Sequence, residues 1–154
     1  MKYECPLLAV RDIEKSKEFY RTVLGLEVIE DLGANVTLTG GIALQSFDTW
    51  KEFIHKQENE VSFGGNDSEL YFEEDNMDAF IEKLSQIEIE YVHMLTEHAW
   101  GQRVVRFYDL DRHIIEVGEA MQVVVSRFLN SGLSAEQTAE RMDVPIEYVR
   151  AYMQ

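Results

Sequence analysis

A strand–helix–strand–strand–strand pattern packed into residues 5–47 is the feature that most constrains the fold. Cys5–Val10 is short and apolar, with Pro6 near its start, which predicts a buried strand. Asp12 is suited to cap a following helix with one apolar face, and Gly25 is suited to end it. Three short strands are predicted next, separated by glycine-containing turns: Leu26–Glu30, Ala34–Leu38 and Ile42–Phe47.

The same order of elements recurs in the second half of the chain. A short helix is predicted over Trp50–Gln57, and residues 58–67, which contain Gly64-Gly65, are predicted to be a linker. A strand at Glu69–Glu73 and a helix capped by Asp75 or Asn76 follow. Three further strands complete the set: Ile89–His93, Arg103–Tyr108 and His113–Val117. We therefore predict an α+β fold of two βαβββ modules, about residues 3–57 and 68–118, related by duplication of topology.

Residues 119–154 differ in pattern and predict a helical extension. A helix is expected over Glu119–Asn130, and Ser134 to Gln137 fits a capping box that opens a helix ending near Met142. Pro145 is suited to the first turn of a last helix that ends near Met153. This extension resembles a helix-turn-helix, but its second helix offers Glu147 and a single arginine, Arg150. We interpret the extension as a packing or dimerisation element.

Charge and composition narrow the class of protein. The chain has 29 acidic and 14 basic residues, a net charge of -15. Such a chain repels phosphate backbones, which argues against nucleic acid, and it attracts cationic ligands. Its one cysteine, Cys5, cannot form an internal disulfide, the sequence contains no membrane-length apolar run, and its first residues lack the apolar stretch typical of a signal peptide. We expect a single-domain cytoplasmic protein.

Two motifs carry a resemblance to a known family. The first comprises LAVRDIEKSKEFY at residues 8–20 with VLGL at 23–26, and the second is WGQRVVRFYDLDRHIIE at 100–116. In this order, they resemble the opening and closing elements of the vicinal oxygen chelate superfamily, which includes glyoxalases, bleomycin-resistance proteins and dioxygenases. The resemblance covers residues 3–118 and implies two βαβββ modules that form a cupped half-barrel sheet, often in a homodimer.

The resemblance also implies a site at four strand positions, because alternate strand residues from several strands can converge on one ion. In this sequence the positions are Cys5, Gln45, Glu69 and Glu116. Glyoxalase I-like relatives usually have His or Gln, Glu, His and Glu there, and extradiol dioxygenases have two histidines and one glutamate. None of the four is histidine here, which argues against extradiol cleavage. The set allows a divalent metal (Zn²⁺, Ni²⁺ or Mn²⁺) or none.

The leading hypothesis is a glyoxalase-like lyase or isomerase of unknown substrate. In that chemistry a metal polarises adjacent substrate oxygens while Glu116 or Glu69 moves the proton. The candidate substrate pocket comprises Gln45, Tyr71, His98, Trp100, Arg103 and Phe107. Arg103 and Arg106 are three apart on one predicted strand and should face opposite sides, so that one can meet a substrate anion or pair with Glu116.

Two alternatives stay open from the sequence. One is a metal-free protein, similar to bleomycin-resistance members, that sequesters a cationic small molecule by charge and aromatic stacking. The missing histidines and the net charge favour it. The other is a ligand-sensing regulator with residues 119–154 as its output.

Overall fold

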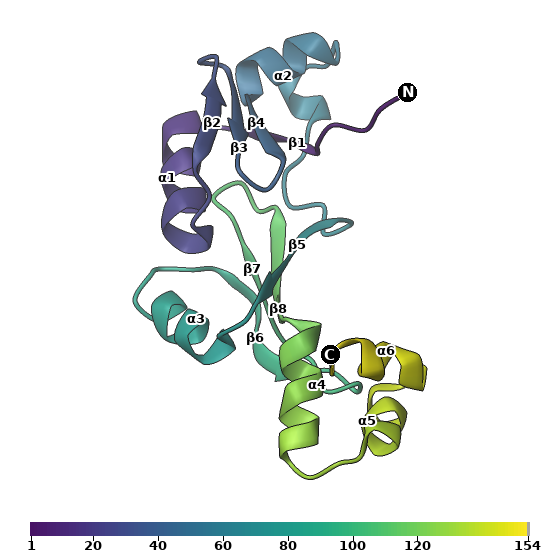
Figure 1. Cartoon of the computed structure of the whole chain (residues 1–154). Helices are drawn as coiled ribbons and strands as arrows, with labels where there is room; N and C mark the ends of the chain where they lie inside the picture. The colour runs from purple at the N-terminus through teal and green to yellow at the C-terminus, as the bar shows by residue number, and fades with distance from the viewer. Residues whose placement is uncertain (154) are drawn as a thin grey trace. The chain divides into compact units, whose positions relative to one another are not determined.

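The computed structural model describes residues 1–153, and the fold is α+β, with two modules of the same topology (Figure 1). The first module contains β1 (Leu7–Val10), α1 (Ile13–Leu24), β2 (Val28–Asp31), β3 (Asn35–Leu38) and β4 (Ile42–Ser46). The second contains β5 (Glu69–Glu74), α3 (Met77–Leu84), β6 (Tyr91–Glu97), β7 (Arg103–Tyr108) and β8 (Ile114–Glu119). The strand orders β1-β4-β3-β2 and β5-β8-β7-β6 are equivalent, and the first strand of each module runs parallel to the last. This confirms the predicted βαβββ modules.

The chain divides into two compact units. Unit 1 comprises residues 1–68 and the turn at 108–113, and unit 2 comprises residues 69–107 and, among the described residues, 114–153. The turn is fixed within unit 1 by the carboxylate of Asp109, which accepts hydrogen bonds from the Tyr20 hydroxyl and the His113 imidazole, both at 2.8 Å. His113 is therefore part of the hydrogen-bond network that holds the turn.

Helix α1 begins and ends at the residues that its capping signals predicted. The Asp12 side chain accepts a hydrogen bond from the Lys15 amide at 3.1 Å, and Gly25 adopts the left-handed conformation with φ 70°. Tyr20 and Val23 are buried on one face of this helix. The helix is therefore defined by local chemistry and held by one apolar face.

Several predicted boundaries were wrong. The first strand starts at Leu7 rather than Cys5, since the ladder with β4 begins at the pair of Leu7 with Ala43. The other corrections are α2 at Phe47–Phe53 instead of Trp50–Gln57, β6 at Tyr91–Glu97 instead of Ile89–His93, and β8 at Ile114–Glu119 instead of His113–Val117. Helix α2 follows β4 directly and is ended by His55 at φ 55°, which no sequence signal marked. A 3-10 turn, η1 (Glu58–Glu60), follows.

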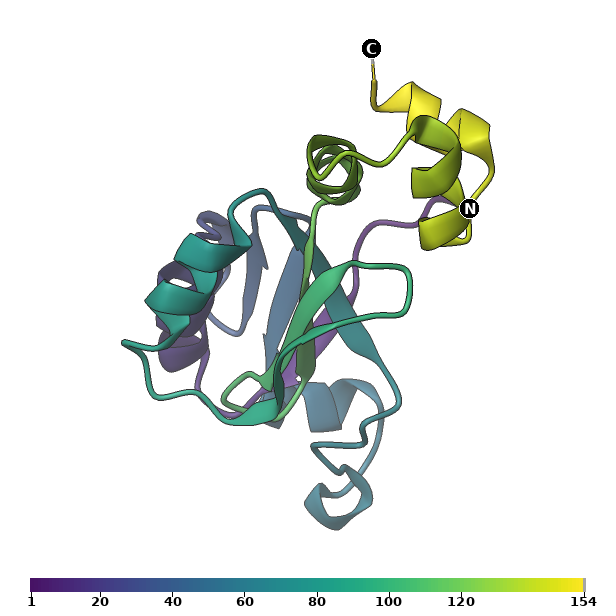
Figure 2. The ribbon, with the colours of Figure 1, turned by 90° about the horizontal axis from the view of Figure 1, so that it is seen from below.

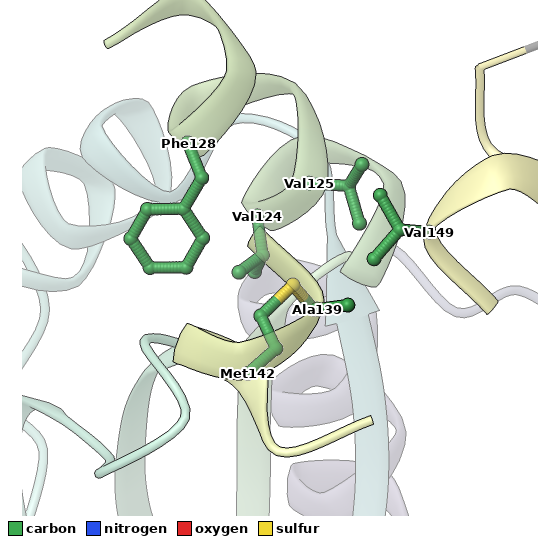
Figure 3. Packing of buried hydrophobic residues seen from close by; sticks show 6 residues of the cluster. All are labelled: Val124, Val125, Phe128, Ala139, Met142 and Val149. Atoms are coloured by element: carbon green, nitrogen blue, oxygen red, sulfur yellow. The ribbon is translucent and has the colours of Figure 1, made fainter. Parts of the chain in front are cut away.

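The C-terminal extension forms three helices with their own apolar core. They are α4 (Met121–Asn130), α5 (Ala135–Met142) and α6 (Ile146–Ala151), and Figure 2 views α4 nearly along its axis. Helix α4 starts two residues later than predicted, because Glu119 still belongs to β8. The capping box of Ser134 and Gln137 is confirmed. The core residues, shown in Figure 3, are Val124, Val125, Phe128, Ala139, Met142 and Val149.

Within residues 1–153, no helix combines the length and the apolar character needed to cross a membrane.

Candidate functional site

One face of the unit 2 sheet gathers most of the predicted site residues. Strand alternation places Glu69, Tyr71 and Glu73 of β5 on the same face, and Tyr71 is in register with Glu116 of β8. The opposite face is covered by α3, where the ring of Phe107 lies 6.5 Å from that of Phe80, centroid to centroid. We call the first of these faces the open face. It comprises Glu69, Tyr71, Glu73, Gln102, Arg106 and Glu116.

Arg106 of β7 lies between the two carboxylates predicted to be catalytic. Its Nε donates to Oε2 of Glu69 at 2.8 Å, and its guanidinium also forms an ion pair with Glu116, which is only 5% exposed. Nη1 of Arg106 is 3.1 Å from Nε2 of His93. Of the two options left open for the strand arginines, pairing with Glu116 is the one that Arg106 shows.

The open face keeps a negative balance despite this arginine. Glu69, Glu73 and Glu116 contribute three carboxylates against the one guanidinium of Arg106, a difference of two. Glu73 accepts a hydrogen bond from the Tyr71 hydroxyl at 3.0 Å. A positively charged ligand is therefore favoured over an anionic one on this face.

Aromatic side chains and one buried amide form the edge of the open face. Nε2 of Gln102 donates to the Tyr71 hydroxyl at 3.0 Å, and Oε1 of Gln102 accepts from Nε1 of Trp100 at 3.2 Å. Trp100 stacks on His98, with ring centroids 4.2 Å apart and planes inclined by 25°. Tyr71 is 49% exposed and Trp100 39%, so both rings are available to a ligand.

Two functional positions on this face were missed from the sequence. A Cβ at Gly118 would lie 2.8 Å from Nε2 of Gln102 and 3.1 Å from the Tyr71 ring, so Gly118 leaves the room that both side chains occupy. A glycine inside a strand is a signal of such close approach, and it was available in the sequence. Gln102 carried no comparable signal, because its partners are distant in the chain.

The electrostatic surroundings favour a neutral imidazole at His98. Burial lowers the pKa of His98 below its ordinary value of 6.5, and the positive charges of Arg106 and His93 lower it further, while Glu69 opposes them. At pH 7 His98 is therefore able to accept a proton.

The candidates in unit 1 lie in a different setting. Gln45 is buried; its carbonyl accepts from Nδ2 of Asn35 at 2.8 Å, and its amide donates to the Thr49 hydroxyl. Both ends of the Gln45 amide are thus satisfied by neighbours. Cys5 precedes β1 and is half-buried.

Arg103 lies on the helix-covered face of the unit 2 sheet with Phe107. Its guanidinium pairs with Asp78 at 2.7 Å and with the buried Glu119 at 2.9 Å. Phe107 is fully buried. A substrate-binding role for these two residues stays a prediction, and none of the contacts on the open face involves them.

The donor groups do not fit a divalent metal in this arrangement. Among residues 1–153 there is no group of three or more His, Cys, Asp or Glu side chains that could hold an ion. The carboxylates of Glu69 and Glu116 are already paired with the guanidinium of Arg106, and that guanidinium would repel a second cation bound to the same oxygens. A metal at Glu69 and Glu116 would require Arg106 to leave.

Comparisons with known proteins agree with the topology. Residues 3–122 match the glyoxalase-like domain family. A crystal structure of a protein of unknown function from Agrobacterium tumefaciens is 41% identical, with 78% of this chain and 94% of that chain covered and a TM-score of 0.71. No curated protein matches the chain.

Two solved structures from the wider superfamily share the fold. A glyoxalase/bleomycin resistance protein/dioxygenase from Nocardioides is 20% identical over 77% of this chain and 83% of its own, with a TM-score of 0.63. A glyoxalase/bleomycin resistance protein/dioxygenase family enzyme from Burkholderia phytofirmans is 18% identical over 73% and 94%, with a TM-score of 0.63. The repeated βαβββ topology and the match over residues 3–122 together show that the chain belongs to the glyoxalase-like family of the vicinal oxygen chelate superfamily.

Proposed function

We propose that the chain is a metal-independent binding protein for a cationic small molecule, and that the open face of unit 2 holds the ligand. The observation that carries this proposal is the double ion pair of Arg106 with Glu69 and Glu116. It places a fixed protein cation on the carboxylates that a catalytic metal would need. This favours binding over metal-dependent catalysis.

The remaining groups on the open face suit a flat, positively charged ligand. Trp100 and Tyr71 are both partly exposed, and aromatic rings attract cations through their quadrupoles. Glu73, at the edge of the same face, supplies a carboxylate that is not paired with Arg106. The ligand is expected to place its cation near Glu73 and an aromatic or apolar group against Trp100.

A fluorescence titration tests this proposal. The variant Trp50→Phe leaves Trp100 as the only tryptophan, and bleomycin and benzyltrimethylammonium are the cationic probes, with benzenesulfonate as the anionic control. We expect saturable quenching by a cationic probe that EDTA does not change. Glu73→Gln keeps an acceptor for Tyr71 but removes the charge, and should weaken binding several-fold. Glu88→Gln, an exposed carboxylate outside the face, should leave binding unchanged.

The opposite pattern would overturn the proposal. If neither cationic probe binds, while the purified protein retains Ni²⁺, Zn²⁺ or Mn²⁺ or is stabilised by adding one of them, the binding function is wrong. Metal content by mass spectrometry and thermal unfolding with each ion provide this measurement.

A glyoxalase-like lyase is the second candidate, favoured by the neutral imidazole of His98. The charge of Arg106 adds to burial in lowering the pKa of His98, so a neutral His98 can remove a proton while the guanidinium stabilises the developing oxyanion. Deuterium uptake from solvent into the hemithioacetal of methylglyoxal and glutathione, followed by NMR in metal-free buffer, tests this chemistry. Uptake that His98→Gln abolishes would support the lyase, and no uptake above the buffer rate would reject it.

Two expectations from the sequence and the family belong to the same proposal. We expect the protein to act in the cytoplasm and as a homodimer. Light scattering during size-exclusion chromatography tests the dimer, for which a mass near twice the 17.9 kDa of the chain is expected.

A further inference from the structure

The C-terminal helices hold the loop that carries His98 and Trp100. Residues 98–102 connect β6 to β7, and α4 and α5 contact this loop through three side chains: Arg127, Phe128 and Arg141. We propose that these three residues are a loop clamp: positioning residues that set where Trp100 and His98 lie at the edge of the open face. The consequence for ligand binding rests on the proposed function, whereas the clamp itself does not.

Two arginines on different helices donate hydrogen bonds to the loop backbone. Arg127 of α4 donates to the carbonyl oxygen of Gly101, and Arg141 of α5 donates to the carbonyl oxygen of Ala99. Both also pair with Glu97 at the end of β6, at 3.7 Å and 3.2 Å respectively. Charge-assisted bonds to backbone carbonyls fix the loop irrespective of its own side chains.

Phe128 packs so closely against the loop that there is no room for a side chain at Gly101. Gly101 has φ 91°, and a Cβ there would lie 2.2 Å from Cζ of Phe128. The guanidinium carbons of Arg127 and Arg141 lie 5.1 Å and 5.3 Å from the centroid of the same ring. The loop backbone thus lies directly on an aromatic ring flanked by two cations.

The clamp is anchored to the sheet on one side and linked to the open face on the other. Arg127 pairs at 2.9 Å with Glu119, a fully buried residue of β8, and this pair ties α4 to the sheet. The loop is tight, because the Gly101 amide donates to the His98 carbonyl at 2.8 Å. Hydrogen bonds link Trp100 to Gln102 and Gln102 to Tyr71. Release of the loop should therefore expose Trp100 and loosen the hydrogen bond that orients Tyr71.

Acrylamide quenching of Trp100 in the Trp50→Phe background tests the clamp without any ligand. Trp100 is 39% exposed when the loop is held, so Arg141→Ala should raise its quenching constant roughly two-fold if the loop opens. Arg127→Ala should do the same. The matched control is Arg150→Ala on α6, whose pair with Glu136 at 3.6 Å is exposed and away from the loop, and it should leave quenching unchanged. Arg141→Lys keeps the charge but loses the planar guanidinium group. Its quenching constant should therefore lie between those of the wild type and of Arg141→Ala.

A folded Arg141→Ala protein with unchanged quenching would overturn the proposal. Circular dichroism and the thermal midpoint establish folding; should Arg127→Ala fail to fold, because Glu119 loses a partner, Arg141→Ala decides alone. The outcome is separable from the proposed function. If Arg141→Ala raises the quenching constant but neither bleomycin nor benzyltrimethylammonium binds, the clamp is supported and the proposed ligand class is rejected. If a cationic probe binds but Arg141→Ala leaves the quenching constant unchanged, only the clamp is rejected.

Discussion

Arg106 is the side chain that pairs with two of the carboxylates on the open face. A guanidinium is planar, permanently charged and able to serve two carboxylates at once, and it is less strongly hydrated than an ammonium group. Glu116 is nearly buried, and a carboxylate in that position needs a partner cation. In this chain the partner cation is the guanidinium of Arg106, which belongs to a strand of the same sheet.

Removing Arg106 should both weaken the fold and create metal affinity. In Arg106→Met the buried Glu116 keeps its charge without a partner, which should lower the free energy of unfolding by about 3 kcal/mol. The freed carboxylates of Glu69 and Glu116 can then accept Zn²⁺ or Ni²⁺, so either ion should recover part of the loss. Urea unfolding with and without metal measures both effects, with Arg150→Met as the control. A variant as stable as the wild type and indifferent to metal would contradict the assignment.

Glu119 should make stability sensitive to acid. Burial alone would raise its pKa, but hydrogen bonds from Arg103 and Arg127 and their charges lower the pKa overall, below the ordinary 4.5. A pKa that is depressed in the folded state stabilises the protein above the unfolded value, and that contribution is lost as the pH falls through the folded value. Glu119→Gln should therefore be less stable than the wild type at pH 7, and the difference should shrink below pH 4.5. Urea unfolding at several pH values measures the difference; a gap that stays constant with pH would disprove the role.

At the scale of elements, the sequence predicted best where local chemistry decides. Helix α1 and helix α5 begin at their capping residues, Asp12 and Ser134, because a cap acts within three residues of itself. Strand β6 extends to Glu97, beyond its predicted end, since its partly exposed alternating residues carry no stop signal. Cys5 falls outside β1, because pairing with β4 begins only at Leu7. Such boundaries are set by partner strands.

The candidate site was predictable to a similar degree. The pairing of Arg106 with Glu116 follows from the alternation of residues along a strand, and it was one of the two stated options. The link from Trp100 through Gln102 to Tyr71 joins residues up to 31 positions apart, and it exists only once β5 and β7 lie in one sheet. The loop clamp likewise depends on residues 127, 128 and 141, which lie beyond the family match that ends at residue 122.

Gly101 should be intolerant of substitution because two elements meet there. In Gly101→Ala the new Cβ would collide with the Phe128 ring, and a φ of 91° is strained for any L side chain. We expect a loss of about 2 kcal/mol in unfolding free energy, or a displaced loop with higher acrylamide quenching of Trp100. Gly132→Ala, also at positive φ but with nothing within 4 Å, separates backbone strain from the collision. Equal effects of the two substitutions would show that Phe128 is not the cause.

The distribution of charge matters for the molecule as a whole. The 14 basic residues are outnumbered by 29 acidic ones, and arginines of the open face and the C-terminal helices are already paired with carboxylates. In helix α6 only Arg150 is basic, and it lies near Glu136. A regulator that grips DNA through these helices would have to overcome this balance. The same balance raises the local concentration of small cations, in keeping with the proposed ligand class.

Ionic strength should stabilise this protein at neutral pH. A net charge of -15 disfavours the compact state through self-repulsion, and salt screens that repulsion. Raising NaCl from about 0.01 M to about 0.1 M shortens the Debye length from about 30 Å to about 10 Å. A gain near 1 kcal/mol in the free energy of unfolding corresponds to a rise of roughly 2–4 °C in the thermal midpoint at pH 7. Near the isoelectric point of about 4.5 the repulsion vanishes, and the same salt series should leave the midpoint unchanged or lower it.

A midpoint that falls with salt at pH 7 would mean that local ion pairs, including those of Arg106, outweigh the net repulsion.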